Sequence, residues 1–144
     1  MFKPKILAFA GSTRNKSWNK MLVKVAAEGA KDAGADVTVV DLRDYPMPLY
    51  DGDLESLHGV PDKAREFKSL LGDHHGFLVA SPEYNGGYSA VLKNALDWAS
   101  VKSAPEEKPL SVFNGKTASL MSAAPGALGG LRGLYQLRDL LMNL

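Results

Sequence analysis

Short apolar runs alternate with longer amphipathic stretches along the whole chain. The apolar runs are uninterrupted, as is typical of strands that are covered on both faces in a parallel sheet. They predict four strands, at residues 6–10, 37–40, 77–80 and 118–121. In the stretches between and after them, apolar residues recur three or four positions apart, which predicts helices at residues 20–28, 62–71, 91–99 and 131–141. This alternation predicts a doubly wound α/β sheet.

Two longer stretches, residues 42–60 and 102–114, show no such pattern and are expected to be loops. Long loops in compact domains are often functional. The chain has 144 residues, so we expect one domain, residues 1–144.

The amino-acid composition and charge argue against several kinds of binding partner and chemical site. The hydrophobic content of 45% and charged content of 23% are ordinary for a soluble globular protein, and the formal charge of +1 gives no reason to expect nucleic acid or a membrane surface as partner. No apolar stretch approaches the roughly 20 residues of a membrane span, and the N-terminus does not have the pattern of a signal peptide. The absence of cysteine excludes disulfides, thiolate metal sites and a cysteine nucleophile. It fits a cytoplasmic protein whose redox chemistry, if any, comes from a bound cofactor.

In an open α/β sheet, ligands bind at the carboxyl ends of the strands. The loop after the first strand is rich in hydrogen-bond donors and leads into a helix, where a phosphate is favoured. Ser12, Ser17 and Asn19 can donate to phosphate oxygens, and Arg14 can add charge-assisted bonds. The alternative is that Ser17 only caps the helix and Arg14 is solvated. Neither nucleotide-binding glycine fingerprint is present, which weighs against a dinucleotide-binding Rossmann domain and an ordinary nucleoside triphosphatase.

The loops after the third and fourth strands also have ligand-binding features. Between residues 81 and 88, Pro82 stiffens the chain and two glycines let the backbone approach a flat ligand, beside which Tyr84 can lie. A plain strand-to-helix turn is the alternative. Residues 122–130 form a small-residue loop that suits a ligand, a neighbouring subunit or simply close helix packing.

Other candidate sites are weak. The adjacent His74 and His75 lack a third metal ligand at a suitable spacing and are expected in a solvated turn. The acidic residues 51, 53 and 55 do not have EF-hand spacing and indicate a solvated face. Ser12 and Ser17 lack a convincing histidine and acid, which disfavours serine hydrolysis.

Three groups of residues, taken together, match the sequence pattern of a known protein family. They are Gly11-Ser12-Thr13-Arg14 with Ser17 and Asn19; Asp41-Leu42 followed by Pro46-Met47-Pro48-Leu49-Tyr50; and Pro82-Glu83-Tyr84-Asn85 followed by Leu92-Lys93-Asn94-Ala95-Leu96-Asp97-Trp98. Together they resemble the NADPH-dependent FMN reductase family, which has a flavodoxin-like, three-layer fold and includes quinone, azo-dye and chromate reductases. The resemblance runs from about Lys5 to the end of the chain.

The resemblance implies a role for each loop, with FMN as cofactor and NADPH or NADH as co-substrate. It implies that the FMN phosphate is held by Ser12, Arg14, Ser17 and Asn19, that the isoalloxazine ring is lined by Pro82, Glu83, Tyr84, Asn85 and Gly86, and that Ser122 and Gly126 flank the flavin. It names no catalytic side chain. Members are usually homodimers or homotetramers, with the segment 46–50 near the subunit contacts and the cofactor.

One departure from the family pattern concerns the C-terminal end. Family members usually continue past the fourth helix into a fifth strand and a last helix, whereas this chain stops at Asn143-Leu144. We therefore expect a sheet without its fifth strand, and a fourth strand that forms an unpaired edge. Either the chain is a truncated version, or oligomerisation or an exchanged segment covers that edge.

The leading hypothesis is an NAD(P)H-dependent, FMN-containing reductase that passes hydride to a small acceptor such as a quinone, an azo compound or a metal oxyanion. One alternative is a flavodoxin-like electron carrier that does not itself oxidise NAD(P)H. Such carriers tend to be strongly acidic and to have hydroxyl-rich phosphate loops, so the near-zero charge and Arg14 favour the reductase. Another alternative is a flavin-free scaffold that persists only as an oligomer.

Overall fold

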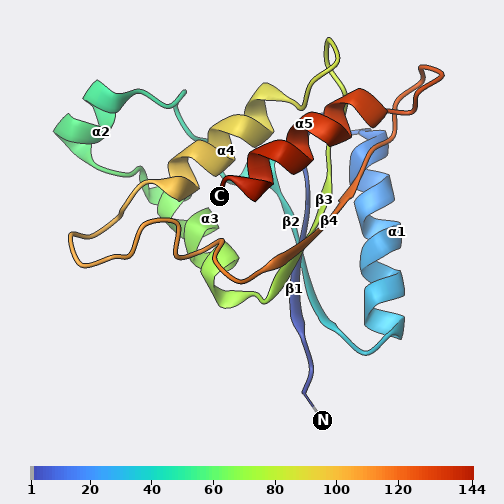
Figure 1. Ribbon diagram of the computed structural model, residues 1–144, viewed down its shortest axis with the longest axis horizontal. Helices are drawn as coiled ribbons and strands as arrows, with labels where there is room; N and C mark the ends of the chain where they lie inside the picture. Colours follow the sequence, from blue (N-terminus) through green and yellow to red (C-terminus); the bar gives the residue numbers. More distant parts are fainter. Residues whose placement is uncertain (1) are drawn as a thin grey trace.

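The computed structural model describes residues 2–144 and contains the predicted doubly wound α/β sheet (Figure 1). Within these residues four strands form one parallel sheet in the order β2-β1-β3-β4. The strands are β1 (Lys5–Ala10), β2 (Asp36–Asp41), β3 (Gly76–Ala80) and β4 (Thr117–Met121). All four predicted strands are confirmed, and β4 lies at an edge of the sheet as expected.

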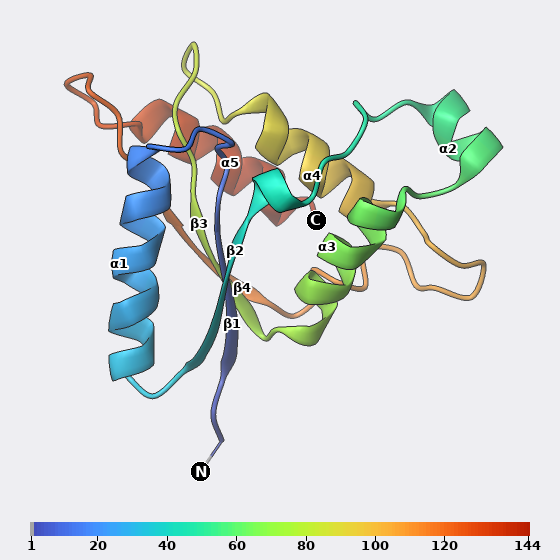
Figure 2. The same ribbon diagram turned by 180° about the vertical axis from the view of Figure 1, so that it is seen from behind.

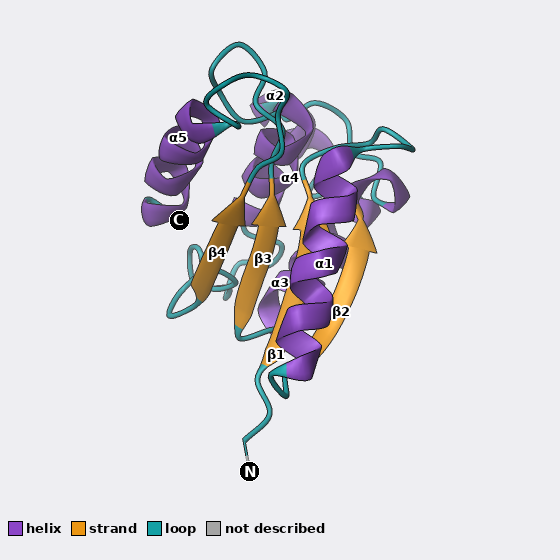
Figure 3. Ribbon diagram, turned by 90° about the vertical axis from the view of Figure 1, so that its right-hand side faces the viewer, coloured by secondary structure: helices purple, strands orange, loops and turns teal. Residues whose placement is uncertain are grey.

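Helices cover both faces of the sheet, giving three layers (Figure 3). One face carries α1 (Trp18–Asp32), and the other carries α3 (Asp62–Asp73), α4 (Ala90–Ser100) and α5 (Leu131–Met142). These are the four predicted helices. Among residues 2–144, no helix has the length and apolar content needed to cross a membrane.

The two faces of the sheet are packed differently. On the α1 face the buried side chains are small, including Ala8, Ala10 and Ala80, so the helix lies close to the strands. On the other face Phe9, Phe67 and larger aliphatic residues form the main core. The apolar runs of β1 and β3 are continuous because each strand contributes to both layers.

The segment between β2 and α3 is more ordered than its sequence suggests. It contains a 3-10 turn, η1 (Leu42–Asp44), and a short helix, α2 (Gly52–His58), which projects from the rest of the chain (Figure 2). Asp51 starts α2 because its carboxylate accepts hydrogen bonds from the backbone N–H groups of Asp53 and Leu54. The acidic run therefore includes a helix cap, which the interpretation as a plain solvated face did not foresee.

The other long loop, residues 102–114, joins the end of α4 to the start of β4 and so lies at the amino edge of the sheet, away from the carboxyl ends. Its Val112 and Phe113 side chains are buried in the main core. Buried Lys68 reaches from α3 to form an ion pair with Glu107 at 2.5 Å. This loop is therefore part of the packing and is not near the predicted site.

The expected solvated turn at His74 is wrong. His74 is buried, and its ring nitrogens lie 2.7 Å from the Leu70 carbonyl oxygen and 2.9 Å from Thr38 Oγ1. The ring thus joins the end of α3 to β2, where burial is compensated by hydrogen bonding. Among the described residues there is no group of three potential metal ligands.

Truncation of Leu71 should be strongly destabilising, because this α3 side chain is 0% exposed in the main core. We expect Leu71→Ala to lower the free energy of unfolding by about 2–5 kcal/mol, measured by urea denaturation. The matched control is Leu57→Ala in α2, where the side chain is 77% exposed and the change should stay within about 0.5 kcal/mol. Equal effects of the two substitutions would contradict the packing described here.

Candidate functional site

The parallel pairing brings the three predicted ligand loops together at the carboxyl ends of the strands (Figure 1). Hydrogen bonding continues past the strands: Gly11 N–H donates to the Ala80 carbonyl at 2.8 Å, and Ser81 N–H donates to the Met121 carbonyl at 2.9 Å. The loops after β1, β3 and β4 therefore leave the sheet side by side. They make the candidate site, at the place where an open α/β sheet binds ligands.

The loop after β1 leaves the start of α1 available to an anion. Ser17 is buried at the N-cap position, yet its side chain makes no capping hydrogen bond to any described residue. The backbone N–H groups of the first turn consequently keep their donor capacity and the partial positive charge of the helix end. The alternative in which Ser17 only caps the helix is not what the structure contains. Arg14 lies exposed beside this turn, with its guanidinium 3.2 Å from the Lys16 carbonyl.

Asn19, which was predicted to contact the phosphate, also has partners within the chain that were not predicted. Its side-chain amide donates to the Ala123 carbonyl at 3.0 Å and accepts from Ala123 N–H at 2.9 Å. This pair of bonds joins the first turn of α1 to the loop after β4. Asn19 therefore braces the third loop against the first, which sequence spacing could not indicate because the partners are 104 residues apart.

The loop after β3 is a tight hairpin and not a plain strand-to-helix turn. Tyr84 and Gly87 exchange backbone hydrogen bonds of 2.9 and 3.0 Å. Between them, Asn85 and Gly86 have φ values of 52° and 81°, the pair of positive values that a two-residue Asn-Gly turn adopts. The Tyr84 side chain is 52% exposed and accessible to a flat ligand.

Glu83 lies at the base of this hairpin and points toward α5. Its carboxylate accepts hydrogen bonds from the Arg132 side chain and from Gly133 N–H. The hydrogen bonds from Arg132 and Gly133, assisted by the Arg132 charge, hold the pKa of Glu83 below its usual value. At neutral pH the Glu83 carboxylate is therefore ionised, and Arg132 balances its negative charge.

The loop after β4 contains an unpartnered buried hydroxyl. Ser122 Oγ has no hydrogen-bond partner among residues 2–144 although it is inaccessible to solvent. Gly130 packs directly against it with φ of 94°, and a Cβ at Gly130 would lie 1.9 Å from Ser122 Oγ. A buried polar atom without a partner is costly, and no bond from the described residues offsets this cost.

Two adjoining cavities lie among the three loops, with volumes of about 100 Å³ and about 560 Å³. The smaller cavity is lined by the loop predicted to hold the phosphate (residues 11–17, the phosphate loop), the first turn of α1 and the base of the hairpin. The larger cavity is lined by the hairpin tip and the glycine loop (residues 126–130), and the two share Glu83, Ala124 and Pro125. Every predicted cofactor residue except Ser122 lines one of them. The residues present thus fit an elongated ligand with an anionic end at α1 and a planar end between the hairpin and the glycine loop, as FMN has.

Several supporting residues were not singled out from the sequence as contacts of the site. Arg43, just after β2, donates to the side chain of Asn15 and, at 2.6 Å, to the Thr13 carbonyl, and so holds the phosphate loop from the β2 side. On α4, the Asn94 and Trp98 side chains both donate to the Pro48 carbonyl, at 2.9 and 2.8 Å. These contacts explain why the 46–50 segment and the motif of α4 occur together.

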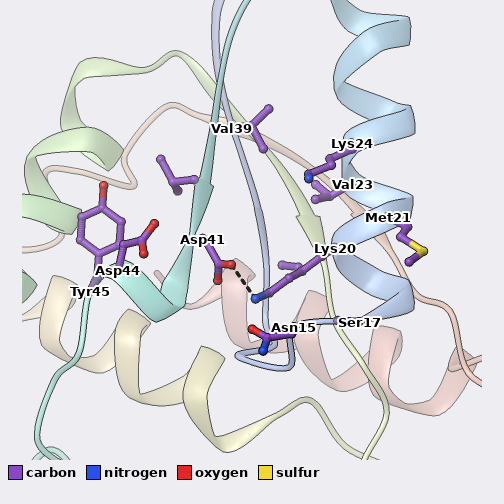
Figure 4. Close-up of a pocket in the computed structure, with 12 residues that line it drawn as sticks. Asn15, Ser17, Lys20, Met21, Val23, Lys24, Val39, Asp41, Asp44 and Tyr45 are labelled. Atoms are coloured by element: carbon purple, nitrogen blue, oxygen red, sulfur yellow. Dashed lines mark hydrogen bonds and ion pairs between the residues drawn. The ribbon is translucent and has the colours of Figure 1, made fainter.

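Another cavity, of about 520 Å³, lies on the β2 side of α1 (Figure 4). Lys20 crosses it from α1 to Asp41 at the end of β2, with a 2.6 Å ion pair. Burial alone would raise the pKa of Asp41, but the hydrogen bonds from Lys20 and from Arg43 N–H, together with their charges, hold it below its usual value. Ser17 is the single predicted cofactor residue in its lining, so this cavity is not the predicted site.

Comparison with known proteins gives a consistent set of relatives. The chain is 36% identical over 138 residues to the NAD(P)H:quinone oxidoreductase of Solanum tuberosum, covering 94% of this chain and 66% of that protein. It is 36% identical over 140 residues to an NAD(P)H-dependent FMN reductase of Pseudomonas aeruginosa, covering 97% and 70%. The chain thus spans about two thirds of the length of these curated relatives.

Among solved structures, the chain is similar to FerB, a flavoenzyme NAD(P)H:(acceptor) oxidoreductase from Paracoccus denitrificans. The TM-score is 0.78 at 26% identity, covering 97% of this chain and 71% of FerB. The model of the NADPH-dependent FMN reductase family matches residues 4–144. The chain therefore belongs to the NADPH-dependent FMN reductase family.

Proposed function

We propose that residues 1–144 act as one FMN-binding domain of an NAD(P)H-dependent reductase, which reduces a small acceptor such as a quinone, an azo compound or a metal oxyanion. The observation that carries the proposal is the pair of adjoining cavities that run from the uncapped start of α1 to the hairpin and the glycine loop. Relatives that are named quinone reductases and FMN reductases support the same assignment.

The chain's own residues bind and orient the cofactor in this proposal. Arg14, the Ser17 hydroxyl and the N–H groups that begin α1 hold the phosphate, since together they supply a cation and several donors. Ser12 is buried in the same loop, with its hydroxyl accepting from Arg14 N–H at 3.3 Å. When bound, FMN takes reducing equivalents from NAD(P)H and passes them to the acceptor.

The hairpin and the glycine loop enclose the flavin ring. Pro82, Tyr84, Asn85 and Gly86 supply one wall and Gly126 belongs to the other. We propose that Ser122 Oγ, which lines neither cavity, gains its missing partner when FMN binds. Asn19 contributes as a brace between the phosphate end and the glycine loop. Proton-transferring side chains are not required of the protein, because the flavin carries the redox chemistry.

We further propose a cytoplasmic homodimer or homotetramer. Absence of cysteine suits a reducing compartment. The projecting segment around α2 exposes Leu49 and Leu57, which favours burial against another subunit. Asn94 and Trp98 anchor this segment to α4 through Pro48, and its first residues, Pro46 and Met47, line a cavity together with Thr13.

Mixing NADPH with the FMN-loaded protein in a stopped-flow instrument separates the reductase from an electron carrier. We expect the visible flavin absorbance to fall on mixing and to return when a quinone is added, because the ring lies at an open edge of the sheet. An FMN complex whose absorbance stays unchanged with both NADPH and NADH would favour the carrier. Protein that takes up no FMN would contradict the proposal altogether.

Arg14→Ala should weaken FMN binding by roughly tenfold, as expected for loss of a charge-assisted contact with the phosphate. Riboflavin, which has no phosphate, should bind equally to the variant and the wild type. Lys31→Ala at the opposite end of α1 is the charge-matched control and should leave both affinities unchanged. Fluorescence titration measures all of these values, and an unaltered FMN affinity in Arg14→Ala would refute the phosphate assignment.

Ser122→Ala should change stability and binding in opposite directions. Removal of a buried hydroxyl without a partner should raise the free energy of unfolding of the FMN-free protein by roughly 1 kcal/mol. The same substitution should weaken FMN binding, because it removes the hydrogen bond that the ligand supplies. Urea denaturation of the FMN-free protein and FMN titration provide the two readouts. Destabilisation with unchanged FMN affinity would show that the hydroxyl serves the fold alone.

A further inference from the structure

The first turn of α5 holds the base of the hairpin that follows β3. Arg132 donates from Nε and from a terminal guanidinium nitrogen to one oxygen of Glu83, at 3.0 and 2.6 Å. Gly133 N–H donates to the other oxygen at 3.2 Å. The Glu83 side chain is 8% exposed and that of Arg132 is 64% exposed, so the carboxylate is shielded while the guanidinium covers it from outside.

One turn further along, α5 also holds the tip of the hairpin. Gln136 donates from its side-chain amide to the Gly86 carbonyl at 3.0 Å. Gly86 is one of the two residues whose positive φ defines the turn. Base and tip are thus attached to two consecutive turns of one helix.

Glycines allow the helix and the hairpin to lie in direct contact. A Cβ on Gly133 would lie 3.2 Å from the Gly87 carbonyl oxygen, and a Cβ on Gly87 would lie 3.0 Å from the side-chain oxygen of Gln136. Both distances are shorter than ordinary van der Waals contact. The close contact between α5 and the hairpin therefore requires glycine in both elements, and the ion pair between Arg132 and Glu83 is not the only interaction that holds them together.

We propose that Arg132 and Gln136 are positioning residues for the flavin ring, which act by fixing the hairpin 83–87 on α5. Because α5 begins directly after the glycine loop 126–130, these contacts make the two loops on either side of the ring into one rigid unit. This inference rests on the proposed function, because it concerns how the FMN site is prepared. A loop that is ordered before the cofactor arrives lowers the entropic cost of binding.

The ion pair also controls the charge beside the ring. An unpaired carboxylate at Glu83 would oppose the negative charge that develops on a flavin as it is reduced. Arg132 compensates that charge, and the bonds from Arg132 and Gly133 leave both carboxylate oxygens engaged. Glu83 thereby serves as an anchor for the hairpin without acting as an acid or base.

The test compares Arg132→Gln, Gln136→Ala and Glu83→Gln with the control Arg138→Gln, an exposed arginine on the same helix whose side chain has no hydrogen-bond partner among the described residues. Hydrogen exchange is measured first on the FMN-free proteins. We expect exchange of the Tyr84 and Gly87 amides to be at least about fivefold faster in the three test variants, because opening of the hairpin no longer breaks the contacts with α5. Exchange in β1 and β3 should be unchanged.

FMN affinity and the visible circular dichroism of the bound flavin are measured next. We expect Kd to rise on the order of fivefold in Arg132→Gln, with an altered dichroism spectrum at saturating FMN, and Arg132→Lys to restore part of both. Hairpin exchange and FMN affinity equal to those of Arg138→Gln would overturn the inference while leaving the reductase proposal intact. Wild-type protein that binds no FMN would instead overturn the reductase proposal, and the exchange rates would still report whether α5 orders the hairpin.

Discussion

The site depends on one constraint, the close contact at Gly11 where β1 ends. A Cβ at this position would lie 2.9 Å from the Cβ of Leu92 and 3.0 Å from the hydroxyl of Ser89, so only glycine lets the loop pass this close to the start of α4. Ser89 then donates to the Gly11 carbonyl at 2.6 Å and accepts from Leu92 N–H as the cap of α4. This contact joins the phosphate loop to the helix that follows the hairpin.

The three ligand loops are held mainly by side chains from other elements. Asn19 of α1 holds the loop after β4, Arg43 holds the loop after β1, and Arg132 of α5 holds the hairpin after β3. Each of these polar contacts connects elements that are far apart in the chain. At the carboxyl ends of the strands the loops are thus held in place by one another and by neighbouring elements, as expected of a site that binds a rigid, planar cofactor. The unpartnered hydroxyl of Ser122 is the exception, and it lies beneath Gly130 in the loop after β4.

The two long segments that were predicted as loops, residues 42–60 and 102–114, differ in the contacts they make. The segment after β2 contributes Arg43 to the phosphate loop and is fastened to α4 through Pro48, so it belongs to the carboxyl edge. The segment before β4 contributes Val112 and Phe113 to the core at the other edge. The two segments adjoin opposite ends of the sheet, because one follows the carboxyl end of β2 and the other precedes the amino end of β4.

The sequence by itself determined the order of strands and helices, because continuous apolar runs and helical spacing record which faces are buried. It also indicated three loops rich in glycine and hydroxyl residues as candidates for ligand binding, and the structure brings these loops together. The short helix α2 was missed, since its seven residues are too few to show a helical period and none of its side chains is fully buried. The burial of His74 was missed because its partner Thr38 lies on β2, 36 residues away in the chain.

The tertiary structure decided what each polar side chain does. The motifs of Asn19 and Glu83 predict contact with FMN, and they did not indicate that these side chains also bond to Ala123 and Arg132, which lie 104 and 49 residues away. A motif fixes the type of a side chain and the loop it occupies. Its partner is fixed only when the sheet has brought distant segments within hydrogen-bonding distance, because those bonds depend on relative positions that no local pattern contains.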